Sequence, residues 1–245
     1  MIKLDLPPKP RQLTDELQNR LTQEYKDTGK AVWKIEWLNH AVSDMSYSKC
    51  CFSEIRLGEE SKYMEIEHFY PKKLYPDIVM EWGNLLPSCK KCNGTKREHD
   101  TLNEPILNPF VDNPKDYLYF KNYRYYSKNK NEIGVRTIDV LGLNDHEHFV
   151  SPRFKIGNEI IEILQDFKDN IQNLDVSKKQ IRFILRLKNL LEQGNRKKEY
   201  AALVSTIILN DESYSELELL LKLKGLWDND FEKIKEELIF CALLE

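Results

Sequence analysis

The fold is decided by Glu65-Ile66-Glu67-His68-Phe69-Tyr70-Pro71 and, after a short gap, by Trp82-Gly83-Asn84-Leu85-Leu86-Pro87-Ser88-Cys89-Lys90-Lys91-Cys92-Asn93-Gly94-Thr95-Lys96. In it an acid directly precedes His68, Asn84 follows His68 by 16 positions, and Asn93 follows Asn84 by 9. An ordered set of this kind rarely arises by chance. Short apolar pieces at 51–57, 64–69 and 84–88, before a helix near residue 91, predict strands followed by a helix.

The residues in this order suit the hydrolysis of a phosphodiester. That reaction needs a base, a divalent cation and donors that hold the phosphate. His68 is the candidate base, because histidine has an ordinary pKa of about 6.5 and is neutral at working pH. Glu67 and Asn93 offer hard oxygen ligands for Mg²⁺ or Mn²⁺, and Asn84 is predicted to hold the His68 loop. The candidate contacts to a nucleic-acid backbone are Lys90, Lys91, Lys96 and Arg97.

Five cysteines occur in the chain, at positions 50, 51, 89, 92 and 241. Four of them form two close pairs, which suits metal binding better than disulfides in a chain expected to be intracellular. Cys50, Cys89 and Cys92 are therefore candidate zinc ligands. Cys241 stands alone in an apolar segment, and we expect it to pack in the core.

The rest of the chain predicts an α+β protein. With 41% hydrophobic and 31% charged residues, the chain is able to bury an ordinary core. Residues 1–45 are predicted to form an extended arm and helices, with Thr14 as the first N-cap. Residues 46–105 form the catalytic module, 106–150 a turn-rich hairpin closed by 135–141, and 151–245 a helical lobe.

Composition also limits the partners and the compartment. No run of about 18 apolar residues occurs and the first residues lack a signal-peptide centre, so we expect a cytoplasmic protein without membrane contact. The net charge of −3 excludes binding of nucleic acid by bulk charge. Residues 178–199 contain eight Lys or Arg and only two Glu, whereas residues 211–245 contain ten acidic residues and four Lys. This polarity predicts one basic end for phosphates and one acidic end.

The ordered residues resemble the HNH, or ββα-metal, nuclease motif, here with Asn93 in the final position. Its wider surroundings, residues 67–72, 82–86 and 108–112, resemble the HNH subunit of Septu-type and retron-associated anti-phage systems, over roughly residues 1–155. The resemblance implies that His68 is the base, Asn84 is structural and Asn93 binds the cation. It also implies an ABC/SMC-like ATPase subunit as partner and degradation of nucleic acid during phage infection.

One departure from this family concerns its structural zinc, which two Cys-x-x-Cys pairs hold. Cys89 and Cys92 match the second pair, but Cys50 is followed at the matching position by Ser53, and Cys51 is adjacent. A serine hydroxyl is a poor zinc ligand beside thiolates. Either three thiolates bind zinc with a borrowed ligand, or zinc is lost and packing holds the strands.

The sequence therefore predicts a metal-dependent HNH endonuclease that acts on DNA or RNA, with DNA the favoured substrate. The sequence does not decide between them, because chemistry at a phosphate does not depend on a 2′-hydroxyl. Two alternatives remain open. One is a non-catalytic zinc module that binds nucleic acid or serves as a scaffold for the ATPase. The other is a stand-alone restriction-type nuclease.

Overall fold

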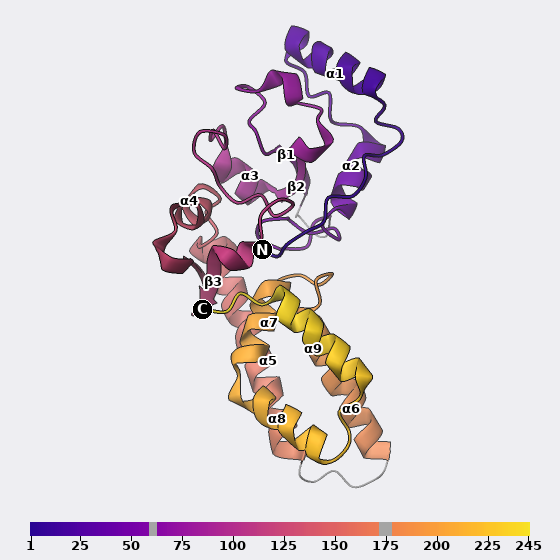
Figure 1. Cartoon of the computed structure of the whole chain (residues 1–245), viewed down its shortest axis with the longest axis vertical. Helices are drawn as coiled ribbons and strands as arrows, with labels where there is room; N and C mark the ends of the chain where they lie inside the picture. Colours follow the sequence, from indigo (N-terminus) through magenta and orange to yellow (C-terminus); the bar gives the residue numbers. More distant parts are fainter. Residues whose placement is uncertain (59–62, 172–177) are drawn as a thin grey trace.

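The chain folds into two lobes stacked along its long axis (Figure 1). The computed structural model describes residues 1–58, 63–171 and 178–245. The upper lobe holds helices α1 (Asp15–Thr28) and α2 (Glu36–Asp44) beside a small β-hairpin and a short helix, and the lower lobe is built from helices. The two chain ends lie at the junction of the lobes. The predicted α+β class with a helical C-terminal region is confirmed.

The quoted stretch forms the centre of the upper lobe. Strands β1 (Met64–His68) and β2 (Leu85–Cys89) pair antiparallel, with His68 opposite Leu85, and helix α3 (Lys90–Lys96) follows β2 directly. The Cys89 side chain caps α3 by accepting a hydrogen bond from the Cys92 amide. The expected order of strand, strand and helix is confirmed for these residues.

The predicted strand at 51–57 is wrong. This segment makes a single bridge, between Lys49 and Arg56. The chain turns instead at Ser53, whose amide donates to Cys50 Sγ at 3.4 Å, and at Glu54, whose φ of 64° lies in the left-handed region. A left-handed residue interrupts an extended strand, so the apolar residues of this segment are buried by a turn.

The N-terminal arm packs on the module as an extended segment. Ile2 and Leu4 are buried, and Trp82 Nε1 donates to the Pro7 carbonyl at 2.8 Å. Helix α1 then begins after Thr14, whose hydroxyl accepts from the Leu17 amide as the predicted N-cap.

The middle segment contains short turns and a second hairpin. Strands β3 (Leu118–Lys121) and β4 (Arg124–Ser127) pair antiparallel, as predicted. Residues 135–141 do not close this hairpin but belong mostly to helix α4 (Glu132–Val140), because Asn131 caps the amides of Ile133 and Gly134. Short helical turns lie at η1 (Pro76–Ile78), η2 (Trp82–Asn84), η3 (Pro114–Asp116), η4 (Lys128–Lys130) and η5 (His146–Val150).

The lower lobe consists of α5 (Ser151–Asn170), α6 (Lys178–Leu191), η7 (Glu192–Gly194), α7 (Ala201–Asn210), α8 (Glu212–Leu223) and α9 (Asn229–Cys241). Helix α7 is the central one, since most of its residues are buried. Cys241 is fully buried, which confirms its expected place in the core. Among the described helices, none is long and apolar enough to cross a membrane.

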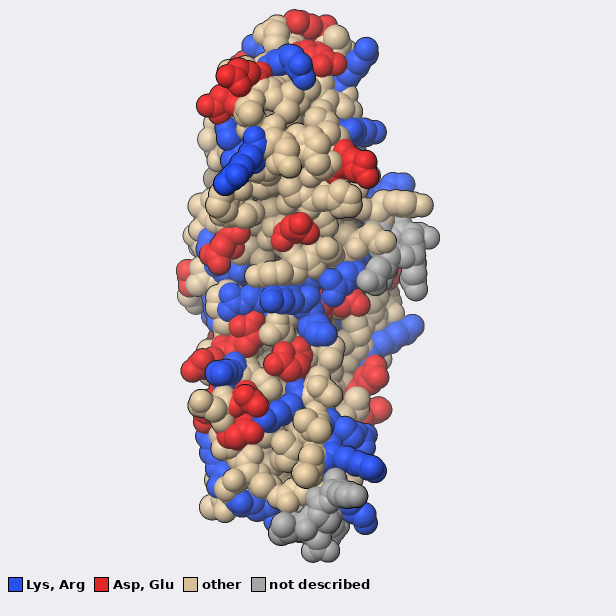
Figure 2. All heavy atoms as spheres, turned by 90° about the vertical axis from the view of Figure 1, so that its right-hand side faces the viewer, with Lys and Arg blue, Asp and Glu red and all other residues tan. Residues whose placement is uncertain are grey.

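The predicted separation into a basic and an acidic end is wrong for this lobe. Lys188 pairs with Asp228 at 2.6 Å and with Asp230 at 3.0 Å, and Arg196 pairs with Glu237 at 2.6 Å. The basic and acidic segments are therefore joined by ion pairs rather than placed at opposite ends of the lobe. Figure 2 shows mixed charges over this part of one face, with a row of Lys and Arg across the middle of the molecule.

A buried carboxylate joins the lobes. Glu54, which is 2% exposed, accepts from the Met1 amino group at 2.7 Å, from Lys49 Nζ at 3.4 Å and from the Ala202 amide of α7 at 3.2 Å. Lys49 also donates to the carbonyls of Arg196 and Lys198. The turn at residues 50–54 is thereby fixed to the lower lobe.

Candidate functional site

The structure brings three of the four motif residues to one small cavity. Glu67, His68 and Asn93 line a space of about 30 Å³ at the end of β1 and beside α3. This space is large enough for a small ion or a water molecule, whereas a phosphate group must approach from outside. The remaining lining residues are Pro71, Lys72, Lys73, Arg97 and Glu98.

The His68 imidazole is held in one orientation and one tautomer. Its Nε2 lies 3.0 Å from the Val79 carbonyl oxygen, and the Trp33 ring packs edge-on at 4.5 Å between ring centroids. A carbonyl oxygen only accepts, so Nε2 carries the proton and Nδ1 keeps its lone pair. Burial and then the Lys72 ammonium lower the pKa of His68 to about 3. The ring is therefore neutral in the folded protein at working pH.

This shift makes stability depend on pH. The unfolded chain binds the His68 proton below about pH 6.5, whereas the folded chain binds it only below about pH 3. The contribution of His68 to stability is thus complete above about pH 6.5 and is lost as the pH falls, by up to about 1.4 kcal/mol per unit. Between pH 7 and pH 5 we expect the wild type to lose about 2 kcal/mol more than His68→Leu in urea unfolding. Equal losses would contradict the buried neutral ring.

Asn84 does not line the cavity but ties together the loop that follows β1. Its Oδ1 accepts from the Tyr70 amide at 2.7 Å, and its Nδ2 donates to the carbonyls of Tyr70 and Ile78 at 3.3 and 3.0 Å. Ile78 precedes Val79, whose carbonyl oxygen accepts the hydrogen bond from His68 Nε2. The role predicted for Asn84, which is to hold the His68 loop, requires contacts of this kind.

Lys96 does not make the predicted phosphate contact, because its side chain points into the protein. Its side chain is fully buried, and Nζ lies 2.6 Å from Glu67 Oε1 and donates to the His68 carbonyl at 3.0 Å. Because α3 packs on this face of β1, the amine is used inside the protein. Burial raises the pKa of Glu67, and the Lys96 ammonium acts in the opposite direction.

The sequence reasoning missed Glu65. Its Oε2 accepts from Asn93 Nδ2 at 2.6 Å, which orients the amide and leaves Oδ1 as the ligand atom for a cation. Strand alternation places Glu65 on the same face of β1 as Glu67, and this pattern was the available signal. Lys72 was missed as well; it lines the cavity and lies 5.3 Å from the Trp33 ring centroid.

The other predicted basic residues lie around a wider groove. Lys90, Lys91 and Arg97 line a space of about 980 Å³, together with the exposed Tyr63. Lys90 and Arg97 are exposed, while Lys91 pairs with Asp145 at 2.6 Å. Arg97 also lines the small cavity, and its φ of 52° is strained for a residue other than glycine. Arg97 therefore lines both the groove and the small cavity.

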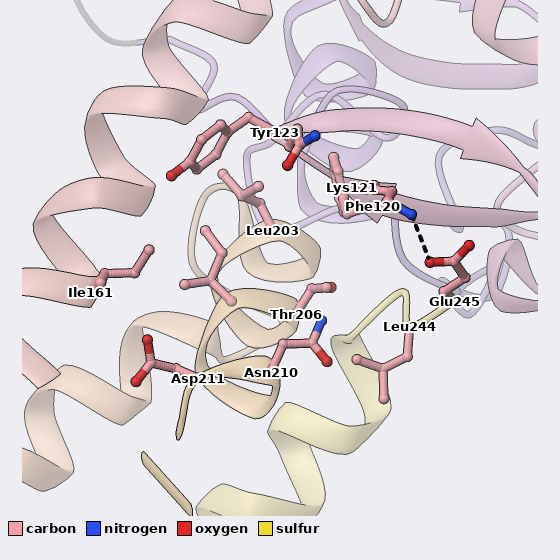
Figure 3. A pocket seen from close by; sticks show the side chains of 12 residues that line it. Phe120, Lys121, Tyr123, Ile161, Leu203, Thr206, Asn210, Asp211, Leu244 and Glu245 are labelled. Atoms are coloured by element: carbon pink, nitrogen blue, oxygen red, sulfur yellow. Dashed lines mark hydrogen bonds and ion pairs between the residues drawn. The ribbon is translucent and has the colours of Figure 1, made fainter. Parts of the chain in front are cut away.

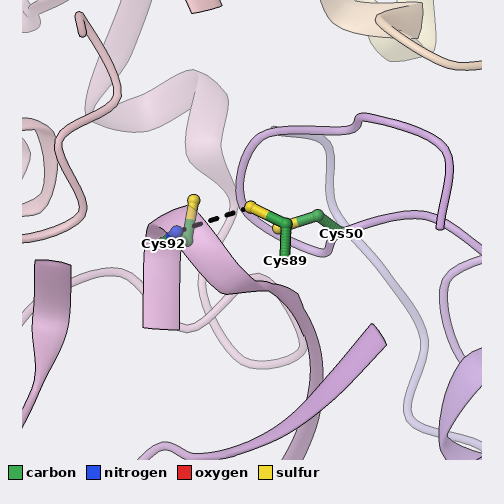
Figure 4. A group of neighbouring side chains, drawn as sticks. All are labelled: Cys50, Cys89 and Cys92. Carbon is green, nitrogen blue, oxygen red and sulfur yellow. Dashed lines mark hydrogen bonds between the residues drawn. The ribbon is translucent and has the colours of Figure 1, made fainter. Parts of the chain in front are cut away.

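The three candidate zinc ligands are brought together. The sulfurs of Cys50, Cys89 and Cys92 all lie within 4.8 Å of one another and are buried (Figure 4). Burial opposes ionisation of Cys50, but hydrogen bonds from the other two thiols and from Ser53 outweigh it and hold the pKa of Cys50 well below its ordinary value. Soft thiolates at this spacing fit a zinc ion.

A further cavity, of about 660 Å³, lies between the β3–β4 hairpin, α5, α7 and the C-terminal residues (Figure 3). It is lined by both apolar and polar side chains, and its cation Lys121 pairs with Glu245 at 3.3 Å. None of the four motif residues lines it. It is therefore separate from the candidate site.

Comparison with known proteins places the chain in a family. No family model matches the chain. It is 38% identical over 239 residues to Septu protein PtuB of Bacillus thuringiensis, an alignment that covers 96% of this chain and 92% of the relative. It is also 28% identical over 207 residues to Septu protein PtuB of Bacillus mycoides (strain KBAB4), covering 72% of this chain and 66% of that relative. A match of this identity over nearly the full length of both chains shows that the protein belongs to the Septu PtuB family.

Proposed function

We propose that the chain is a metal-dependent endonuclease that cleaves DNA in preference to RNA and acts with an ATPase subunit in anti-phage defence. The defence role rests on the Septu relatives. The nuclease role rests chiefly on one observation: Asn93 lines the same small cavity as the consecutive residues Glu67 and His68, which precede it by about 25 positions. A base and two hard oxygen ligands at one point are what hydrolysis of a phosphodiester needs.

His68 is the general base in this proposal. Val79 holds the Nε2 proton, so Nδ1 accepts the proton of the attacking water. A pKa of about 3 makes the ring a weak base in the free protein. Because a bound phosphodiester adds negative charge beside Lys72, it raises the His68 pKa toward the working pH. Substrate binding thus activates its own base.

Glu67 and Asn93 would hold the divalent cation. A carboxylate and an amide oxygen suit Mg²⁺ or Mn²⁺, which keep several waters when bound. When bound, the cation supplies charge that stabilises the scissile phosphate in the transition state. Glu65 keeps the Asn93 amide turned for this role, and Lys96 balances the Glu67 carboxylate until the cation is present.

Nucleic acid would approach through the wider groove. Lys90 and Arg97 are exposed cations on one wall, and Tyr63, 76% exposed, offers a face for a base. Because Arg97 borders both spaces, a backbone lying in the groove places a phosphate at the mouth of the small cavity.

The proposal is tested by following cleavage of plasmid DNA and bulk tRNA as a function of Mg²⁺ concentration, with the ATPase subunit present. Wild type is expected to cut DNA and to stop when a chelator is added. Asn93→Ala is expected to need about 10-fold to 100-fold more Mg²⁺, because it removes one ligand. Asn170→Ala, which changes an exposed asparagine of the lower lobe, is the matched control and should behave as wild type.

Three outcomes would count against the proposal. If wild type cuts neither substrate in Mg²⁺ or Mn²⁺ while still binding the ATPase, the non-catalytic module is the better description. If Asn93→Ala cuts with the wild-type Mg²⁺ dependence, the cation site lies elsewhere. If full activity needs no ATPase, a stand-alone nuclease is indicated.

A further inference from the structure

The thiol cluster supplies three ligands, whereas a structural zinc ion takes four. Cys51 does not supply the fourth, because among the described residues only the sulfurs of Cys50, Cys89 and Cys92 form a group within 4.8 Å. The fourth ligand has to come from another residue beside the cluster.

Ser53 occupies the same position relative to Cys50 as Cys92 occupies relative to Cys89. Its amide donates to Cys50 Sγ at 3.4 Å, and the Cys92 amide donates to Cys89 Sγ at the same distance. Residues 50–53 and 89–92 therefore form two equivalent turns. In the second turn the last residue is the ligand Cys92, and in the first turn the last residue is Ser53.

The distance from the Ser53 hydroxyl to one of the sulfurs also fits a shared metal ion. Ser53 is 1% exposed, and its Oγ lies 3.7 Å from Cys89 Sγ. Ligands of a tetrahedral zinc ion, with bonds of about 2.0 to 2.3 Å, lie roughly 3.5 to 3.8 Å apart. We propose that the Ser53 hydroxyl is the fourth ligand of a zinc ion held by Cys50, Cys89 and Cys92.

A second buried serine provides a comparison. Ser88 Oγ lies 3.9 Å from Cys50 Sγ, but it also donates to the Cys89 carbonyl at 3.3 Å and belongs to strand β2 rather than to a turn around the cluster. Ser88 thus contacts one sulfur without occupying the last position of a turn. It is the matched control for Ser53.

The proposal has a chemical consequence that does not depend on nuclease activity. A neutral hydroxyl binds zinc more weakly than a thiolate, so this centre exchanges its metal more readily than a four-thiolate centre. The thiols release their protons to solvent when the metal binds, and the serine keeps its own. Restoring a thiolate at position 53 should tighten the site.

The test uses the full chain and the variants Ser53→Cys, Ser53→Ala and Ser88→Ala. Each is loaded with Co²⁺, whose sulfur-to-metal absorption reports the number of thiolates, and its Zn²⁺ affinity is measured by competition with a chelating dye. Wild type should show three thiolates. Ser53→Cys should increase the charge-transfer absorption by about a third and bind Zn²⁺ at least about 10-fold more tightly. Ser53→Ala should bind about 10-fold more weakly, and Ser88→Ala should match wild type.

Other results overturn the assignment. Wild type that binds neither ion has no such centre. Unchanged absorption and affinity in Ser53→Cys, or unchanged affinity in Ser53→Ala, show that residue 53 is not a ligand. A larger loss in Ser88→Ala than in Ser53→Ala assigns the fourth position to Ser88 instead.

Discussion

His68→Ala is expected to lower the rate of nucleic-acid cleavage by roughly 10²-fold to 10⁴-fold, which is the usual contribution of a general base. The reason is the fixed tautomer: Val79 holds the Nε2 proton and leaves Nδ1 as the acceptor. The measurement is the initial rate on plasmid DNA, with the ATPase subunit and Mg²⁺ present. Added imidazole should restore part of the rate, because the deleted ring leaves a space beside Trp33.

The control for this prediction is His99→Ala. His99 binds the Glu104 carbonyl and does not line the small cavity, so its loss should leave the rate unchanged. Thermal unfolding of both variants separates a chemical effect from a loss of structure. If folded His68→Ala cleaved at the wild-type rate, His68 would not be the general base.

Glu54→Gln is expected to lower the free energy of unfolding by about 3 to 5 kcal/mol, the usual effect of removing one partner from a buried ion pair. The substitution leaves the Met1 ammonium and Lys49, both buried, without their counter-charge. Burial opposes ionisation of Glu54, but these two cations outweigh it and keep its pKa below the ordinary value. The measurement is urea unfolding at pH 7.

The matched control is Glu216→Gln, which breaks the exposed ion pair between Glu216 and Lys168. Exposed pairs contribute little because water and salt screen them, so this variant should unfold close to wild type. If Glu54→Gln were equally close to wild type, the buried network would not hold the lobes together.

Local pattern was sufficient to predict much of the fold. The short apolar pieces at 64–69 and 84–88 predicted the hairpin, the N-cap at Thr14 predicted the first helix, and the apolar period of the last third predicted the helical lobe. The segment 51–57 was mistaken for a strand because its apolar residues are buried by long-range packing. Burial alone does not distinguish a strand from a turn.

The sequence indicated only some residues of the candidate site and did not reveal how they pair with one another. The order of Glu67, His68 and Asn93 indicated residues that meet at one cavity. That Lys96 turns inward to Glu67 depends on the packing of α3 against β1, which no single-residue property reveals. The same packing brings Glu65 to Asn93. The partners of the charged residues around the cavity could therefore be identified only from the structure.

The hydrogen bonds between the turn at 50–56 and residues 196–202 bear on how the molecule denatures. The Tyr200 amide donates to the Glu54 carbonyl at 3.2 Å, and the Arg56 amide donates to Glu199 at 3.0 Å. If one lobe unfolded alone, these groups and the charges of Lys49 and Glu54 would lose their partners in the other lobe. We therefore expect the two lobes to unfold together, in a single transition whichever lobe is monitored.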